Sequence, residues 1–458
     1  MERYILIFVV GIMIFKIPIT YAQEVLTLEK CINLALENNH SIKIAEEKLI
    51  EANAKKQEAF GHFLPSLSVS ASYNRMSEVP SLNMISPNYT TVKVQDLITG
   101  QPVIGAIITG AESFKYKMGQ EDSYVSKLTL NQPLFTWGKI RMQYKYACLN
   151  YDLTEEEYRK VKNELIFNVE KSFYFVLLAQ EFLKISEEAV SVMEKHYEAI
   201  QGFYKEGKVS TVDVSRVEVL LVNAKTKKIK AENSFKLAKK SLLNLINLKE
   251  DREWQIQGEL KFKPEEINLE KFYKIALENS PEIKQLSIQK NIVLGFLKFA
   301  ESENKPSLVF IANYQYQKPF YFENDWKDNW NAILALDFPF FNGFSDIGKI
   351  KQVKSQIEQL EITEDQLNKG IRLEIEKLCL DLQEAKERIQ EQEINVKVAK
   401  DNLEIIQKRY EKGLVSDLDL RDTQLALTQA ETEYSQALFD YNIALIGLEK
   451  ATGKLGKQ

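Results

Sequence analysis

The chain has 458 residues, of which 27% are charged and 45% hydrophobic, and its formal net charge is −5. A mildly acidic chain without a basic block argues against nucleic acid as a partner. The three cysteines, Cys31, Cys148 and Cys379, are too widely spaced to indicate a disulfide framework or a metal-binding knuckle.

The N-terminus has the pattern of a cleaved secretory signal. A charged start precedes an apolar run over residues 4–15, and small residues precede a predicted cleavage site after Ala22. An uncleaved membrane anchor would need roughly 20 consecutive apolar residues, and Lys16 interrupts the candidate stretch. We therefore predict a signal peptide over residues 1–22. No later apolar run is long enough for a membrane helix, so any membrane segment must consist of strands.

The mature sequence repeats itself. The motif Leu-Glu-Lys followed by Ala-Leu-Glu-Asn occupies residues 28–38 and recurs at residues 269–279, an offset of 241. The motif Pro-Ser-Leu occurs at residues 65–67 and again at residues 306–308, with the same offset. A period this long indicates two duplicated halves and not a short-repeat solenoid.

Further along the chain the offset becomes smaller. Residues 204–210, Tyr-x-x-Gly-x-Val-Ser, match residues 410–416 at an offset of 206. The change predicts an insertion in the first half, which we place at residues 77–122 and interpret as a loop that faces outside the cell. We predict structural repeats over residues 23–248 and 249–458.

Four segments alternate between apolar and polar residues, as half-buried strands do. They lie at about residues 66–74, 124–132, 307–317 and 329–338. Each has about nine to eleven residues, the length that a tilted strand needs to cross a bilayer. A soluble sheet would alternate in the same way, but the aromatic residues at 320–322 and at Trp326 favour a membrane interface. The residues that we expect to face lipid are Leu67, Val69, Tyr73, Leu128, Leu130, Leu308, Phe310, Tyr314, Leu334 and Leu336.

The rest of the chain is predicted to be helical, with two very long helices. Residues 139–202 and 348–413 contain no proline, and 64 helical residues rise by roughly 96 Å. Apolar residues recur with the three-four spacing of a coiled coil, while Glu and Lys cover the other positions.

Four membrane strands cannot close a barrel, because single-chain barrels start at about eight strands. An open edge in lipid would leave unpaired backbone groups that cost several kcal/mol each. If the strands lie in a membrane, several copies of the chain must therefore complete one barrel.

The sequence resembles the TolC family of outer-membrane efflux proteins over essentially the whole mature chain. The resemblance rests on the duplicated motifs above, on Gln-Pro-Leu-Phe at residues 132–135, on Phe-Pro-Phe-Phe-Asn-Gly at residues 338–343, and on their order. It implies a mainly α-helical fold with a membrane β-barrel, in which a homotrimer shares twelve strands. It also implies an exit duct in the outer membrane with a periplasmic extension, which docks to a periplasmic adaptor (membrane fusion protein) and an inner-membrane transporter. No cofactor or metal is implied.

The resemblance also implies a periplasmic gate at the turns of residues 204–207 and 410–413. Two positions depart from the family pattern: Val415, and Val209 in the first half, stand where the family has a basic gate residue. In this reading Arg216 or Arg421 takes the basic role, and converging aspartates form rings that favour cations. Asp213 and Asp419 could instead be ordinary carboxylates at helix starts. The residues onto which the family gate maps are Tyr410, Asp213, Asp419 and Asp422.

Two alternatives compete with the channel. An enzyme would need a cluster of reactive groups, but the three histidines, His40, His62 and His196, lie far apart, and we expect them at the surface or at an interface. No phosphate-binding glycine loop or nucleophile motif is present. The second alternative is a periplasmic coiled-coil adaptor or scaffold with soluble strands. Such a protein would need strands around a shared core, whereas these come as two isolated pairs.

Overall fold

The computed structural model describes residues 25–248, 254–321 and 323–455. The predicted signal peptide lies outside these residues. The chain divides into two compact units, the first with residues 1–50, 152–288 and 360–458 and the second with residues 51–151 and 289–359. None of the described helices is both long and apolar enough to cross a bilayer.

Helices dominate unit 1, and four of them continue along the chain into unit 2. The elements within unit 1 are β1 (Val25–Leu26), α1 (Leu28–Asn38), α4 (Thr211–Leu245), β6 (Gln255–Ile256), α5 (Leu269–Asn279) and α8 (Asp417–Ala451). The helices shared by the two units are α2 (His40–Gly61), α3 (Lys139–Lys205), α6 (Pro281–Ser302) and α7 (Ser345–Glu411).

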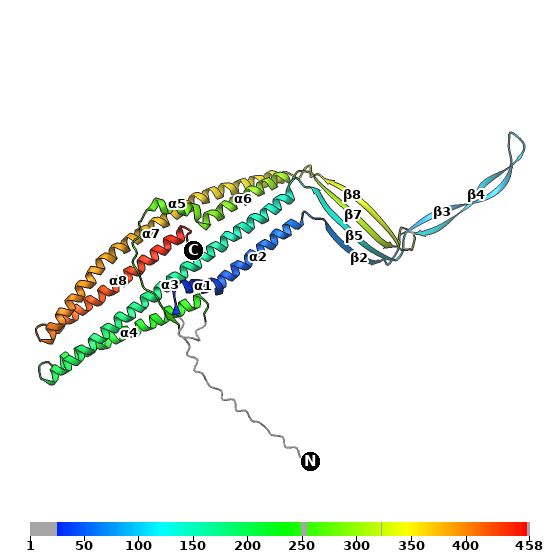
Figure 1. Cartoon of the computed structure of the whole chain (residues 1–458). Helices are drawn as coiled ribbons and strands as arrows, with labels where there is room; N and C mark the ends of the chain where they lie inside the picture. The colour runs from blue at the N-terminus through cyan, green and yellow to red at the C-terminus, as the bar shows by residue number, and fades with distance from the viewer. Residues whose placement is uncertain (1–24, 249–253, 322, 456–458) are drawn as a thin grey trace, which may run out of the picture. The chain divides into compact units, whose positions relative to one another are not determined.

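The strands of unit 2 form one four-stranded sheet and one hairpin (Figure 1). The sheet has the order β2-β5-β7-β8, and β3 pairs with β4. These strands are β2 (Ser66–Arg75), β3 (Ser81–Gln95), β4 (Pro102–Lys117), β5 (Asp122–Phe135), β7 (Ser307–Lys318) and β8 (Lys327–Asp337).

The duplication predicted from the sequence is present in the fold. Helices α1 and α5 each have 11 residues, α2 and α6 each have 22, α3 and α7 each have 67, and α4 and α8 each have 35. Each half therefore runs short helix, helix, strand pair, long helix and closing helix. The first half differs by the added hairpin β3–β4.

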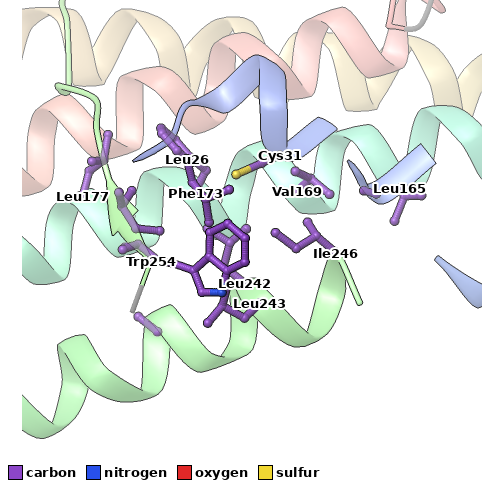
Figure 2. Close-up of a cluster of buried hydrophobic side chains, with 14 of the residues drawn as sticks. Leu26, Cys31, Leu165, Val169, Phe173, Leu177, Leu242, Leu243, Ile246 and Trp254 are labelled. Carbon is purple, nitrogen blue, oxygen red and sulfur yellow. The ribbon is translucent and has the colours of Figure 1, made fainter. Parts of the chain in front are cut away.

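Each half has its own hydrophobic core in unit 1. In the first, Leu26 of β1, Phe173 of α3, Leu242 of α4 and Trp254 pack together, and Figure 2 shows them pointing toward one another. Cys31 is buried in the same cluster. Burying a side chain of this size contributes about 1.5–3 kcal/mol, so these contacts hold the short helix α1 against the long helix α3.

The second core repeats this arrangement with α5, α7 and α8. Ala276 of α5 packs on Ile375 and Leu382 of α7 and on Tyr441 of α8, each at most 1% exposed. The Tyr441 hydroxyl donates to the backbone oxygen of Lys263, which satisfies the one polar atom of this side chain. The segment that joins the two repeats is thereby fastened to the second core.

The register of the four-stranded sheet places the residues predicted to face lipid on one surface. Leu67 pairs with Leu130, Val69 with Leu128, Leu128 with Tyr314, Leu308 with Leu336, and Phe310 with Leu334. Because paired residues of neighbouring strands lie on the same face, the ten predicted side chains share one side. Tyr73 joins them through its partner Tyr124.

The opposite face of the sheet is largely polar, although Val309, Ile311 and Ile333 also lie on it. It carries the serines of β2 that alternate with the apolar residues, and a side-chain ladder crosses β5, β7 and β8. The Thr129 hydroxyl donates to Asn313 Oδ1 at 3.0 Å, and Asn313 Nδ2 donates to Asn331 Oδ1 at 2.9 Å. Asn313 is only 9% exposed. A sheet with one apolar and one polar face is suited to lie between lipid and water.

The insertion differs from the prediction, because it is not an irregular loop. Residues 81–95 and 102–117 form a long antiparallel hairpin with a β-bulge between Asn88 and Tyr89. Its prolines and glycines interrupt the alternation on which a strand prediction depends.

A partly buried carboxylate on α3 makes the stability of the fold sensitive to pH. Burial, and to a lesser extent the charge of Glu449, raises the pKa of Glu170 on α3 from 4.5 to about 7. Its Oε2 atom is buried without a hydrogen-bond partner. The protonated form is therefore favoured by folding. The stability that depends on this proton is complete below about pH 4.5 and is lost as the pH rises through 7.

We expect Glu170→Gln to flatten the pH dependence of stability. An amide keeps the shape of the protonated side chain and carries no charge, so the variant should be more stable than the parent at pH 8 by about 1–3 kcal/mol and similar to it at pH 4.5. Denaturation midpoints at the two pH values measure this, with the exposed residue Glu164→Gln as control. An equal change in the midpoint between the two pH values for Glu170→Gln and the parent would contradict the raised pKa of Glu170.

Candidate functional site at the helix turns

The turns that join α3 to α4 and α7 to α8 have the same backbone design. Lys208 N donates to Phe203 O at 2.9 Å and Gly207 N donates to Tyr204 O at 2.9 Å. The equivalent bonds of the second turn, from Leu414 to Arg409 and from Gly413 to Tyr410, measure 3.0 and 2.8 Å. This pair of bonds ends a helix with a residue of positive φ. The glycines have φ of +74° and +68°, a conformation that strains any residue with a Cβ.

The next helices both begin with a capping box. Asp213 accepts from Ser210 N and Ser210 Oγ at 3.0 and 2.7 Å, and Asp419 accepts from the same atoms of Ser416 at 2.9 and 2.6 Å. These hydrogen bonds lower the pKa of both carboxyls. In the single chain, Asp213 and Asp419 therefore act as helix caps, which is one of the two roles that we considered from the sequence.

The arginines that could replace the family's basic gate residue stay beside their own helix neighbours. Arg216 Nη1 lies 3.9 Å from Asp213 Oδ1, and Arg421 Nη2 lies 3.2 Å from Asp422 Oδ1. Val415 packs instead against a hydrophobic cluster that includes Tyr410. Among the described residues, neither arginine forms an ion pair that bridges the two turns.

Tyr410 and its counterpart Tyr204 have different surroundings although they occupy matching positions. Tyr410 is 9% exposed, whereas Tyr204 is 47% exposed. The Tyr410 ring lies edge-on to His196 and Phe203, with ring centroids 5.1 and 6.5 Å away. Burial, followed by the charges of Asp417 and Asp213, raises the pKa of Tyr410 to about 12. The phenol therefore stays neutral in any physiological solution.

A buried histidine joins the two repeats beside Tyr410. His196 Nε2 on α3 donates to Asp417 Oδ1, which belongs to the first residue of α8. The His196 side chain is 3% exposed and that of Asp417 is 27% exposed. Nδ1 of His196 is buried without a hydrogen-bond partner. The expectation that all three histidines lie at a surface or interface was therefore wrong for His196, while His40 and His62 are exposed.

Sequence reasoning missed His196 and Asp417, but a signal for them exists. At the offset of 206, His196 corresponds to Asn402 and Asp417 corresponds to Thr211. Both positions break the internal repeat within a segment where the backbone is duplicated. The hydrogen bond between His196 and Asp417 therefore links the two repeats, and the residue types at the matching positions differ.

The described residues hold no group of three or more His, Cys, Asp or Glu side chains that could bind a metal ion. The cluster of His196, Asp417 and Tyr410 is instead a mechanical feature. It fixes the start of α8 and the end of α7 to the C-terminal part of α3, so that the two turns are linked.

Comparison with known proteins decides the family. The model of the family described as "Outer membrane efflux protein" matches residues 31–248 and 272–454. The chain belongs to this family. It is accordingly an exit duct of the outer membrane with a periplasmic extension, and not an enzyme or a soluble adaptor. Members of the family act in efflux and secretion systems that also contain adaptor and transporter proteins.

Two curated relatives show the range of this family. The alkaline protease secretion protein AprF of Pseudomonas aeruginosa is 22% identical over 341 residues, which cover 73% of this chain and 70% of the relative. The cobalt-zinc-cadmium resistance protein CzcC of Cupriavidus metallidurans is 26% identical over 162 residues, 35% of this chain and 38% of the relative.

Solved structures share the fold. The CmeC outer membrane channel of Campylobacter jejuni has a TM-score of 0.74 and 17% identity, covering 93% of this chain and 85% of that one. The outer membrane protein VceC of Vibrio cholerae has a TM-score of 0.72 and 17% identity, covering 93% and 96%. These likenesses extend over both units of the chain.

We predict that His196→Ala loosens the start of α8. A hydrogen bond to a charged group contributes about 1.5–3 kcal/mol, so amide hydrogen exchange over residues 412–420 should accelerate by roughly 10- to 100-fold. Lys195→Ala, an exposed neighbour on the same helix, serves as the control. Exchange that is unchanged in His196→Ala would show that the bond does not hold the turn.

Proposed function

We propose that three copies of this chain form one duct, in which their twelve strands close a barrel in the outer membrane. The observation that carries this proposal is the four-stranded sheet, which has one apolar face and no partner on β2 or β8 among the described residues. Backbone groups left unpaired in lipid cost several kcal/mol each. Neighbouring copies would pair these edges, and the apolar face would contact lipid.

The lipid contact rests on exposure as well as on register. Val69 is 73% exposed, Leu334 63% and Leu336 69% in the single chain. Side chains of this kind are unfavourable in water and favourable in hydrocarbon. At one end of the sheet Trp326 stacks on Tyr316 with a centroid distance of 5.0 Å, and Tyr124 lies 5.8 Å from the same indole. Aromatic rings are typical of the membrane interface.

The two turns of each chain are proposed as the periplasmic gate, with His196 and Asp417 as the latch. In the proposed trimer, six turns converge on the axis of the duct. Opening would require the α7–α8 pair to move away from α3, and the bond between His196 and Asp417 opposes this movement. Tyr410 packs beside the bond and shields it from water.

The inner rim of the closed gate is proposed to be acidic. Asp422 is exposed and follows the cap residue Asp419 by less than one helical turn. Copies of both residues around an axis would attract cations and bind multivalent ones. Adaptor and transporter would dock from the periplasmic side. An exported protein, as the name of AprF suggests, and a small solute would leave by the same path.

The test is conductance of the detergent-purified mature protein in a planar bilayer, with its oligomeric mass determined in parallel. A trimer with discrete, cation-preferring openings is expected. The double variant Asp419→Asn with Asp422→Asn should weaken block by a trivalent cation by roughly tenfold or more, because a ring of carboxylates binds such ions tightly.

One control variant makes this test specific. Asp325→Asn changes an exposed carboxylate between β7 and β8, far along the chain from the turns, and should leave block unchanged. Unchanged block in the double variant would remove both aspartates from the gate. A monomer without conductance would refute the duct itself.

A further inference from the structure

The hairpin β3–β4 is a two-stranded ribbon that the proposed function does not use. Its strands have 15 and 16 residues and pair only with each other among the described residues (Figure 1). A two-stranded hairpin by itself is at best marginally stable in water. A hairpin of this length therefore calls for a second layer that covers one of its faces.

The register sorts the exposed apolar side chains of the hairpin between its two faces. Leu82 pairs with Tyr116, Met84 with Phe114, and Val94 with Val103, so these side chains share one side of the ribbon. The bulge after Asn88 leaves one residue of β4 unpaired, which brings Ile107 to the same side. Seven apolar residues of this face, called the apolar face below, are between 44% and 53% exposed: Leu82, Met84, Val94, Val103, Ile107, Phe114 and Tyr116.

Charge distinguishes the two faces. Both faces carry exposed apolar residues, since Ile85, Ile104 and Ile108 on the opposite face are 62% to 73% exposed. That opposite face also carries three lysines, Lys93, Lys115 and Lys117. The apolar face carries a single charged side chain, Glu112. If copies of the ribbon met through the lysine face, nine positive charges would gather around one axis in a trimer. Packing through the apolar face avoids this repulsion.

The ribbon continues directly from the strand edge where a neighbouring copy must bind. Five residues separate the end of the edge strand β2 from the start of β3. At the base, Met76 N donates to Glu121 O at 2.8 Å and Met118 N donates to Pro80 O at 2.7 Å. Val79 is buried there, with 8% exposure. Copies that join along β2 and β8 therefore carry their ribbons into one another's vicinity.

We propose that the apolar face of β3–β4 binds the same face of the hairpins of the other copies, so that the ribbons form a shared hydrophobic core beyond the barrel. The proposal rests on the proposed oligomer. Tethering by the barrel raises the effective concentration of the ribbons to the millimolar range, so modest contacts suffice for association. The shared core would tie the copies together at a place that the barrel strands do not reach.

Cysteine cross-linking tests this contact. We expect Phe114→Cys to give covalent dimers on mild oxidation of the assembled protein, at least about fivefold more than Ser113→Cys, because Ser113 is the next residue on the opposite face. Met84→Cys, which pairs with position 114, tests the same face with a second variant in case one substitution disturbs the hairpin. The parent protein with its three native cysteines provides the baseline.

The outcomes separate this proposal from the proposed duct. An assembled, conducting protein in which neither Phe114→Cys nor Met84→Cys exceeds Ser113→Cys would overturn the ribbon contact alone. Free reaction of both cysteines with a water-soluble maleimide would do so too, since the face would be open to water. Cysteines that neither react with the maleimide nor cross-link would indicate that lipid covers the face. That result would also overturn the contact between ribbons. A monomeric protein would overturn both proposals.

Discussion

The edges of the four-stranded sheet are the constraint on which the rest of the structure depends. A chain that offers an apolar sheet face to a bilayer must pair every backbone group at that depth. This chain supplies four strands in the order β2-β5-β7-β8 and leaves the outer edges of β2 and β8 without partners among the described residues. This deficit requires several copies of the chain, and the number of three is proposed from the resemblance to the TolC family. The internal duplication then explains why the strands come as two pairs, each flanked by helices of the same length.

The internal duplication also makes the contact between His196 and Asp417 informative, because it departs from the symmetry of the two repeats. The two turns share their glycines, their capping boxes and a tyrosine at the same position. Only the second tyrosine is buried, and its neighbour His196 binds Asp417 across the repeats. The backbone design stabilises each turn separately, whereas the side-chain bond couples them. A gate that opens by separating helix pairs needs such a breakable link.

Much of the fold could be predicted because its signals are local. Serines alternate with apolar residues in β2, and the long helices lack proline. The hairpin escaped prediction because its signal is not local. Phe114 and Ile107 share a face only because the bulge shifts the alternation of β4 between them. The latch was missed for a similar reason, since His196 and Asp417 lie 221 residues apart. From the sequence, two such distant positions can be related only by aligning the two repeats with each other.

The central claim is that copies of this chain complete one barrel by pairing β2 with β8. Val69→Cys on β2, combined in turn with Ala332→Cys, Leu334→Cys or Leu336→Cys on β8, tests it directly. Within one chain these strands are three strand spacings apart, about 14 Å, which is too far for a disulfide. The account predicts a covalent trimer for at least one pair, seen by gel electrophoresis after denaturation. A protein that stays monomeric with every pair, although it is inserted in the membrane, would contradict it.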